Sequence, residues 1–203
     1  MKETLPFTNG MTYRINEIFY SLQGEGFHTG RPAVFVRFAG CNLRCPFCDT
    51  DFSYSEPMTA MQIAEKVFVY SKHPDTLIVL TGGEPSLQVN DELINVLHRY
   101  NQTIAIETNG THLIPGGIDW ITISPKDGGK VVLTKADEVK IVLTNQSETE
   151  LQNWLKAIQA TKYYLQPCWQ PDGTSNMQDV VAYILNHPEW RLSLQTHKYI
   201  HIA

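Results

Sequence analysis

Three cysteine residues, Cys41, Cys45 and Cys48, lie close enough together in the sequence for one metal centre to use all of them. A 4Fe-4S cluster is usually held by four cysteine thiolates, one for each iron. A local set of three leaves one iron without a local ligand. That iron must then take a distant ligand or stay open to bind a small molecule. An open iron would make the protein an enzyme.

The same cysteines permit other interpretations. Structural zinc would need Cys168 or a histidine as fourth ligand, but zinc sites usually show two separated pairs of ligands, and the sequence has no second pair. Cys168 could also complete an electron-transfer cluster or be a packed free thiol.

A second stretch whose residues could bind a ligand is the glycine-rich turn Thr81-Gly82-Gly83-Glu84-Pro85. Two glycines after an apolar run let a ligand approach the backbone closely and meet free amide groups. Glu84 could accept hydrogen bonds from an ammonium group. A plain strand-to-helix turn would explain the same residues, so the turn is informative mainly beside the cysteine loop.

Short apolar segments alternate with amphipathic ones, and these elements must position both loops. The expected strands are 13–20, 33–38, 77–80, 103–107, 120–124, 138–143, 163–166 and 190–195. The expected helices are 58–71, 90–100, 148–160 and one that begins near Met177, and Ser147 with Glu150 predicts a capping box. This alternation predicts an α/β fold with mostly parallel strands and functional loops at the strand ends. Roughly six βα units fit an abridged, partial TIM-type barrel better than a full one.

Length and composition restrict the class of protein. A chain of 203 residues is most simply a single domain, 1–203. The net charge of −5, without a block of Lys and Arg, argues against partners such as nucleic acid or anionic membrane. No apolar run approaches the ~20 residues of a membrane span, and the N-terminus lacks an apolar signal core. We therefore expect a cytoplasmic protein, in which cysteines are more often ligands than disulfides.

The spacing of Cys41, Cys45 and Cys48 resembles the C-x3-C-x2-C motif of the radical S-adenosylmethionine (radical SAM) superfamily, and 82–85 resembles its GGEP motif. The resemblance implies a 4Fe-4S cluster whose fourth iron is chelated by the amino and carboxylate groups of S-adenosyl-L-methionine. Reductive cleavage then yields a 5′-deoxyadenosyl radical that abstracts a hydrogen from the substrate. An external, flavodoxin-like electron donor is implied as well.

Several further stretches are similar to the 7-carboxy-7-deazaguanine synthase family. They are 21–26, 35–41, 48–50, 107–111, 124–126 and 195–199. The resemblance runs from about residue 13 to the chain end, with no matching motif in 127–162. It implies a cytoplasmic homodimer with an abridged barrel that uses Mg2+. The implied reaction converts 6-carboxy-5,6,7,8-tetrahydropterin to 7-carboxy-7-deazaguanine with loss of ammonia, within queuosine and 7-deazapurine biosynthesis.

The resemblance also implies roles for single residues. The substrate-binding residues would be Leu22, Gln23, Gly24, Arg37, Thr81, His197 and Ala203, although many relatives end in proline where this chain has Ala203. The residues that contact S-adenosylmethionine would be Gly83, Glu84, Glu107, Ser124, Pro125, Lys126 and Gln166. Thr50 would bind Mg2+, with Asp49 and Asp51 as rival oxygen ligands. No residue is predicted to act as a general acid or base.

Some of these residues have structural alternatives, and the protein has functional ones. Arg37 could form a surface ion pair, and His197 could be a structural histidine. Another small radical SAM enzyme, of the glycyl-radical activating type, would share the cysteine motif but act on a protein. An iron–sulfur electron-transfer module would need Cys168 as a ligand and no glycine-rich turn.

Overall fold

The computed structural model describes residues 11–48, 50–51, 54–71, 73–100, 102–170 and 172–202. Its centre is a nine-stranded sheet with the order β3-β1-β2-β4-β5-β6-β7-β8-β9. The strands are β1 (Thr12–Leu22), β2 (Pro32–Phe38), β3 (Glu56–Thr59), β4 (Leu77–Gly82), β5 (Ile104–Thr108), β6 (Trp120–Ile123), β7 (Glu138–Leu143), β8 (Lys162–Pro167) and β9 (Arg191–Leu192).

The sheet is mostly parallel, as the alternation of elements predicts. Strand β1 runs antiparallel to both β2 and β3, whereas every pair from β2 to β9 is parallel. The edge strands β3 and β9 do not pair with each other in the described part of the chain. The α/β class is therefore confirmed, and an open sheet of this order is consistent with a partial barrel.

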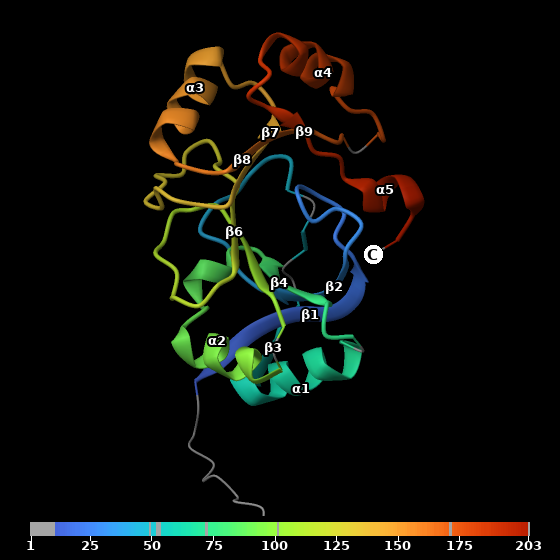
Figure 1. The fold of residues 1–203 in the computed structure, drawn as a ribbon, viewed down its shortest axis with the longest axis vertical. Coiled ribbons are helices and arrows are strands. Elements are labelled where there is room, and N and C mark those ends of the chain that lie inside the picture. The colour runs from blue at the N-terminus through green and yellow to red at the C-terminus, as the bar shows by residue number, and fades with distance from the viewer. Residues whose placement is uncertain are drawn as a thin grey trace, which may run out of the picture.

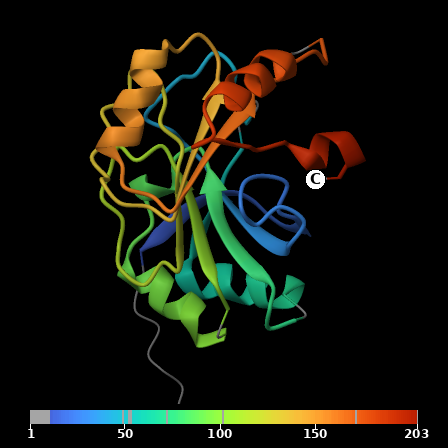
Figure 2. The ribbon, with the colours of Figure 1, turned by 45° about the horizontal axis from the view of Figure 1, so that its top comes forward.

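The helices are α1 (Ala60–Tyr70), η1 (Pro85–Leu87), α2 (Asp91–Leu97), η2 (His98–Tyr100), α3 (Glu148–Ala157), α4 (Met177–Asn186) and α5 (Thr196–Ile200). The four longest, α1 to α4, cover the outer face of the sheet, whereas α5 lies beside loop 23–26. Helices α1 and α2 lie at one end of the molecule and α3 and α4 at the other (Figure 1). Figure 2 shows the sheet between these two pairs. None of the helices in the described ranges combines the length and apolarity that crossing a bilayer requires.

Two clusters of buried apolar side chains fill the space between sheet and helices. One joins β1, β2, β4 and β5 to α1 and α2, through side chains such as Ile63 and Leu93. The other joins β6, β7 and β8 to α3 and α4, through Leu151 and Val180. The partly buried Ile121 packs against both clusters. The alternate side chains of the strands face inward, where polar groups lie beside a smaller apolar cluster of Ala33, Leu77, Val79 and Ala105.

The sequence missed some elements near the chain end and directly before helix α1. The predicted strand 190–195 is wrong in extent, because β9 has only two residues. Beyond it, the Ser193 amide still donates to the Leu165 carbonyl oxygen at 2.9 Å, and the chain then leaves the sheet. The following helix α5 and the short strand β3 carry no periodic apolar pattern, so the sequence does not reveal them.

Candidate active site

Two connected cavities lie at the carboxyl ends of the parallel strands. The large compartment has a volume of about 660 Å³. The small compartment has a volume of about 270 Å³. Seven residues line both, and they are Glu25, Arg37, Thr50, Thr81, Glu107, Gln195 and Lys198. A molecule in one compartment would therefore share a wall with a molecule in the other.

The small compartment contains the cysteine loop and the glycine-rich turn, which are packed backbone to backbone. The Gly83 amide donates to the Phe38 carbonyl oxygen at 3.0 Å, and the Glu84 amide donates to that of Gly40 at 2.9 Å. A Cβ atom on Gly83 would lie 2.0 Å from the Gly40 carbonyl oxygen. Gly82 has a φ of +122°, which a side chain would strain. These glycines are thus required for the cysteine loop to approach, a role that neither the ligand interpretation nor the plain-turn interpretation of the sequence included.

Glu84 is buried and its carboxylate is used within the chain. It accepts hydrogen bonds from the Ser86 amide at 3.0 Å, the Thr108 hydroxyl at 2.5 Å and the Asn109 amide at 2.7 Å. These contacts fix the glycine-rich turn to the end of β5. Glu84 lines the small compartment, yet the geometry gives it a positioning role, and its contact with S-adenosylmethionine stays a prediction.

The three thiols fit a 4Fe-4S cluster better than a single metal ion. Cys41, Cys45 and Cys48 all line the small compartment, and all three are free thiols. Burial raises the pKa of Cys41 and Cys45, while the ammonium of Lys126 opposes the rise at Cys45. In the described ranges, no three His, Cys, Asp or Glu side chains converge on one ion. A zinc site needs such convergence, whereas each thiolate of a cubane binds a different iron.

The residues predicted to contact S-adenosylmethionine mostly line the same small compartment. Gly83, Glu84, Glu107, Ser124, Lys126 and Gln166 do so, whereas Pro125 is not among its lining residues. Lys126 donates to the Ser124 hydroxyl oxygen. Burial, together with the nearby positive charge of Lys140, lowers the pKa of Lys126. Cys168 is buried and also lines this compartment, which the sequence did not indicate.

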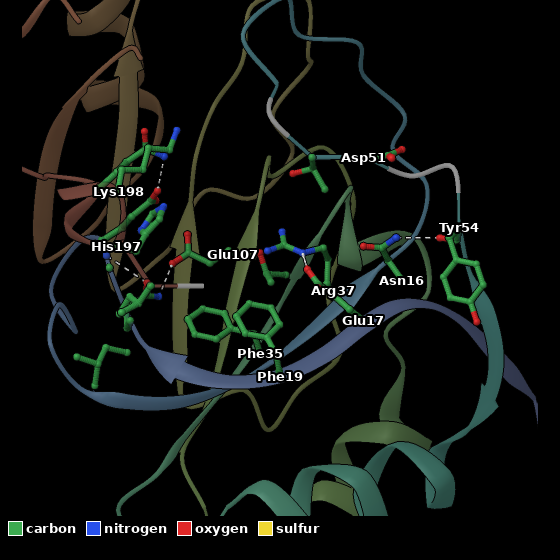
Figure 3. Close-up of a pocket in the computed structure, with 18 residues that line it drawn as sticks. Asn16, Glu17, Phe19, Phe35, Arg37, Asp51, Tyr54, Glu107, His197 and Lys198 are labelled. Atoms are coloured by element: carbon green, nitrogen blue, oxygen red, sulfur yellow. Dashed lines mark hydrogen bonds and ion pairs between the residues drawn. The ribbon is translucent and has the colours of Figure 1, made fainter. Parts of the chain in front are cut away.

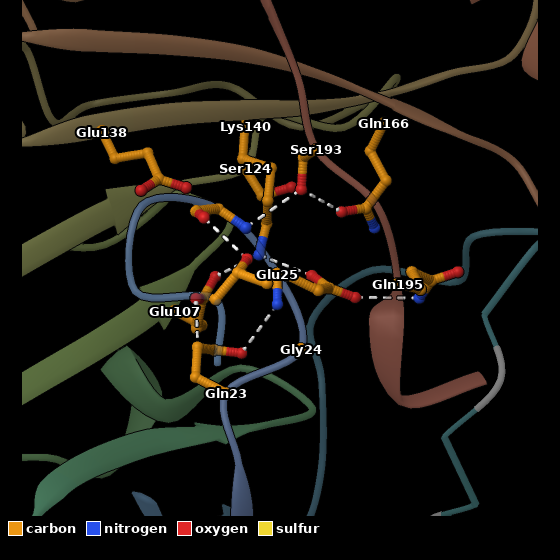
Figure 4. A network of polar contacts seen from close by, with 12 residues as sticks. Gln23, Gly24, Glu25, Glu107, Ser124, Glu138, Lys140, Gln166, Ser193 and Gln195 are labelled. Carbon is orange, nitrogen blue, oxygen red and sulfur yellow. Dashed lines mark hydrogen bonds and ion pairs between the residues drawn. The ribbon is translucent and has the colours of Figure 1, made fainter. Parts of the chain in front are cut away.

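A buried ion network forms the floor that the two compartments share (Figure 4). The ammonium of Lys140 lies 2.6 Å from the Glu25 carboxylate and 2.9 Å from that of Glu107. Gln195 donates to Glu25 at 2.8 Å, and Gln23 donates to Glu107 at 3.3 Å. The network thereby joins loop 23–26, strand β5, strand β7 and the segment before α5.

The charges of this network are unequal because several carboxylates surround one ammonium. Burial lowers the pKa of Lys140, but the carboxylates of Glu107 and Glu25 outweigh it, so the pKa is raised and the group stays charged. Burial raises the pKa of Glu25, yet Lys140 overcomes this and lowers it to about 2. Burial raises the pKa of Glu107, and it raises that of nearby Glu138 to about 7.

The large compartment brings together most of the residues predicted to bind substrate. Leu22, Gln23, Gly24, Arg37, Thr81 and His197 all line it. Ala203 and Asp49 lie outside the described residues. Thr50, predicted to bind Mg2+, lines both compartments, and Asp51 lines the large one. The structure thus places these residues together, while their individual roles stay predictions.

Arg37 forms an ion pair, but inside the cavity. Its Nε lies 2.7 Å from the Glu17 carboxylate, and its guanidinium carbon lies 5.7 Å from the centre of the Phe19 ring. Phe19 in turn stacks on Phe35 with the ring centres 4.9 Å apart. Figure 3 shows the guanidinium directed into the compartment. Because Glu17 uses Nε, the two terminal nitrogens of Arg37 face the cavity.

The chain end holds loop 23–26 against the cavity. The Thr196 amide and hydroxyl both donate to the Gly24 carbonyl oxygen, at 2.9 and 3.0 Å. The His197 ring lies so close that a Cβ on Gly24 would be 2.1 Å from its Nδ1 atom. The sequence missed Glu25, Lys140, Ser193 and Gln195. Glu25 and Gln195 lie in the stretches 21–26 and 195–199 that resemble the family, but no role was predicted for them. Lys140 left another signal, as a single cation within the apolar run Val139-Lys140-Ile141.

A partly open α/β barrel with three clustered thiols beside a glycine-rich turn is the architecture of a radical SAM protein. The sequence model of the Radical SAM superfamily matches residues 35–162. The 7-carboxy-7-deazaguanine synthase of Bacteroides thetaiotaomicron is 49% identical over 192 residues, covering 95% of this chain and 100% of that protein. That of Caulobacter vibrioides is 44% identical over 209 residues, covering 94% and 99%.

A solved structure agrees with these relatives. The crystal structure of QueE from Escherichia coli superposes with a TM-score of 0.76 at 27% sequence identity, covering 92% of this chain and 95% of that one. The chain belongs to the 7-carboxy-7-deazaguanine synthase family. It is therefore a radical SAM enzyme, and the family implies a 4Fe-4S cluster and S-adenosylmethionine. Membership sets aside the electron-transfer and zinc interpretations of the cysteine loop.

Proposed function

We propose that this enzyme converts 6-carboxy-5,6,7,8-tetrahydropterin to 7-carboxy-7-deazaguanine with loss of ammonia, using Mg2+. We further propose that it acts as a cytoplasmic homodimer reduced by a flavodoxin-like donor. The observation that carries the reaction is the pair of compartments. Residues that match the family's substrate positions line the large one, and the cysteine loop lines the small one next to it. When bound, the cluster and S-adenosylmethionine supply one-electron chemistry that removes a hydrogen atom from the substrate.

The chain's own residues would bind and orient the pterin. Arg37 offers two terminal nitrogens to the substrate carboxylate, because Glu17 holds its Nε. The Gln23 amide is fixed by Glu107 and by the Glu25 amide, which donates to it at 3.2 Å. One N–H of Gln23 then remains for the substrate. Thr50 would contribute a hydroxyl oxygen to Mg2+, a hard cation that takes its other ligands from substrate and water.

The substrate ring would be enclosed by segments from both ends of the chain. Loop 23–26 and helix α5 line one side of the large compartment, and the Phe19–Phe35 pair lines another. Enclosure excludes water and holds the reacting atoms in one arrangement, which is the contribution that proteins make to cofactor chemistry.

The test is an anaerobic assay of the reconstituted enzyme with S-adenosylmethionine, dithionite, Mg2+ and the pterin, followed by mass spectrometry. We expect 7-carboxy-7-deazaguanine and 5′-deoxyadenosine, and we expect neither from Cys45→Ala, which should also lose the cluster absorbance. Formation of 5′-deoxyadenosine with an untouched pterin would refute the substrate while leaving the superfamily intact. Radical formation on a protein instead would favour the glycyl-radical activating alternative.

A further inference from the structure

Ser193 lies at a point where loop 23–26 meets strand β8 (Figure 4). The residue is 3% exposed, and its backbone amide is fixed to the Leu165 carbonyl oxygen of β8. Its hydroxyl accepts a hydrogen bond from the Gly26 amide at 3.0 Å and donates one to the Gln166 Oε1 atom at 2.8 Å. A single buried hydroxyl thus links loop 23–26 to Gln166, which lines the small compartment.

These two contacts decide how the Gln166 amide is turned. The Gly26 N–H can only donate, so the Ser193 oxygen must accept from it. The Ser193 hydroxyl hydrogen then needs an acceptor, because a buried donor without a partner costs about 1–3 kcal/mol. Within the described residues, Gln166 Oε1 is the acceptor that Ser193 reaches. If the amide were flipped, the Gln166 N–H2 group would face the Ser193 hydroxyl, and the hydroxyl hydrogen would meet a donor instead of an acceptor.

The Nε2 group of Gln166 is consequently left for a ligand. Gln166 lines the small compartment and is 2% exposed. No hydrogen-bond acceptor for its N–H2 group is found among the described residues. The group is also not one of the unpartnered polar atoms that the described residues enclose completely. An amide donor held this way suits a hydrogen-bond acceptor on S-adenosylmethionine.

We propose that Ser193 is a positioning residue that turns the Gln166 amide toward S-adenosylmethionine and ties this contact to loop 23–26. The proposal rests on the proposed contact between Gln166 and that cofactor. It adds a residue that no motif contains. It also gives a physical link between the compartments, since the same hydroxyl holds the Gly26 amide beside the substrate-lining residues.

The test measures equilibrium binding of S-adenosylmethionine to the anaerobically reconstituted enzyme, with cluster content matched by absorbance. We expect Ser193→Ala to weaken binding by about five- to tenfold, the effect of losing one well-oriented hydrogen bond. Ser193→Thr keeps the hydroxyl and should restore most of the affinity if it folds with an unchanged melting temperature. Hydrogen exchange at the Gly26 amide should become faster in Ser193→Ala.

Thr29 provides a matched control on the same loop. Its hydroxyl donates to the Gly26 carbonyl oxygen at 2.7 Å, but among the described residues it makes no hydrogen bond with Ser193 or Gln166. Thr29→Ala should therefore loosen the loop while changing S-adenosylmethionine binding by less than about twofold. In Gln166→Ala, adding Ser193→Ala should produce no further loss, because the serine acts through the glutamine.

The possible failures are distinguishable. If the unaltered enzyme does not bind S-adenosylmethionine, the proposed function fails with the inference. If the unaltered enzyme binds S-adenosylmethionine but Ser193→Ala and Thr29→Ala have the same Kd for it, the inference alone is overturned. Additive losses in Ser193→Ala and Gln166→Ala would overturn it as well.

Discussion

Lys140 is a buried ammonium shared by two carboxylates, and its removal should be costly. Lys140→Met would leave Glu25 and Glu107 buried without their cation. Breaking one side of a buried pair costs about 3–5 kcal/mol of unfolding free energy, which urea denaturation of the cluster-free protein would measure. The control is Lys66→Met, because Lys66 pairs with Glu56 at 3.4 Å with both side chains about half exposed. Loss of this exposed ion pair should cost at most about 1 kcal/mol of unfolding free energy. Equal costs for Lys66→Met and Lys140→Met would show that the buried network adds no special stability.

Glu138 should make stability fall as the pH rises toward neutrality. Burial raises its pKa from 4.5 to about 7, while Lys140 opposes the rise. Between these values the folded protein holds a proton that the unfolded chain has released. The contribution of Glu138 to the free energy of unfolding therefore decreases with pH in this window, by roughly 3 kcal/mol in total, and is constant outside it. The lowered pKa of Glu25 acts in the opposite direction below pH 4.5, so the two effects do not overlap.

Glu138→Gln isolates this effect because it cannot ionise. Urea unfolding at pH 5 and pH 8 should show a clear loss of stability in the unaltered protein and a much smaller one in the variant. The Phe27 amide, which donates to Glu138 at 2.9 Å, retains an acceptor in the glutamine. An identical pH dependence in both proteins would show that Glu138 is not the group responsible.

Thr50 tests the magnesium assignment separately from the cluster. Thr50→Ala should keep the cluster absorbance, since the residue is not a thiol ligand, but should weaken the stimulation of turnover by Mg2+. Thr50→Ser retains the hydroxyl oxygen and should keep the response. A Thr50→Ala enzyme with full activity and unchanged Mg2+ dependence would refute the assignment, and Asp51 in the same wall would be the next candidate.

At the residue scale, the sequence predicts groups that belong to local motifs and misses those that act across the fold. Cys41, Thr81 and Gln23 were predicted because their neighbours in the chain form recognisable motifs, and the structure places them in the walls of the compartments. Ser193 gave no signal, because its partners Gly26 and Gln166 are distant in sequence and meet only after the sheet has formed. For Glu84 the sequence predicted only a contact with a ligand. It could not reveal the three hydrogen bonds that the carboxylate accepts within the chain, because two of the donors lie at the end of another strand.

At the element scale, periodicity and capping residues located most helices. Ser147 and Glu150 form the predicted capping box at the start of α3, and Thr59 with Gln62 forms another at α1. The predicted helix 90–100 ends early as α2 and continues as the 3-10 turn η2. Helix α5 was missed because tertiary contacts with Gly24, rather than an apolar stripe, hold it in place.

The contact between loop 23–26 and α5 predicts a steric phenotype for Gly24→Ala. The added methyl would overlap the His197 ring, and such overpacking typically costs about 1–3 kcal/mol. If this cost destabilises the packing of loop 23–26 against α5 that encloses the pterin, the KM for the pterin should rise roughly five- to hundredfold, as steady-state kinetics would show. Melting temperature and S-adenosylmethionine binding should change much less.

Two comparisons make the steric cause testable. Gly116→Ala is the matched control, because a Cβ there meets nothing within 4 Å and the backbone needs no positive φ. It should leave the KM unchanged. In His197→Ala the ring is absent, so adding Gly24→Ala should have little further effect. If Gly24→Ala costs as much in that background, the clash with His197 is not its cause.

At the scale of the whole molecule, one sheet carries two apolar cores under its helices, and the inner face, with its ion network and a smaller apolar cluster, connects them. The core around α1 and α2 belongs to strands that bear the cysteine loop and the glycine-rich turn. The core around α3 and α4 belongs to strands that bear Lys140 and Gln166. Within the described residues, the two halves are joined by sheet hydrogen bonds, by the buried ion network, and by the apolar contacts of Ile121 and Trp120.

S-adenosylmethionine in the small compartment should therefore stabilise both halves together. At a concentration 100-fold above its Kd, a ligand that binds only the folded state adds about 2.7 kcal/mol to the free energy of unfolding. Amide exchange should slow by about a hundredfold at Leu80 in one core and at Ile141 in the other. The control is Cys45→Ala without cluster, in which the same addition should change neither amide. Slowing at Leu80 alone would mean that the halves open independently and that the cofactor contacts only the strands of the first core.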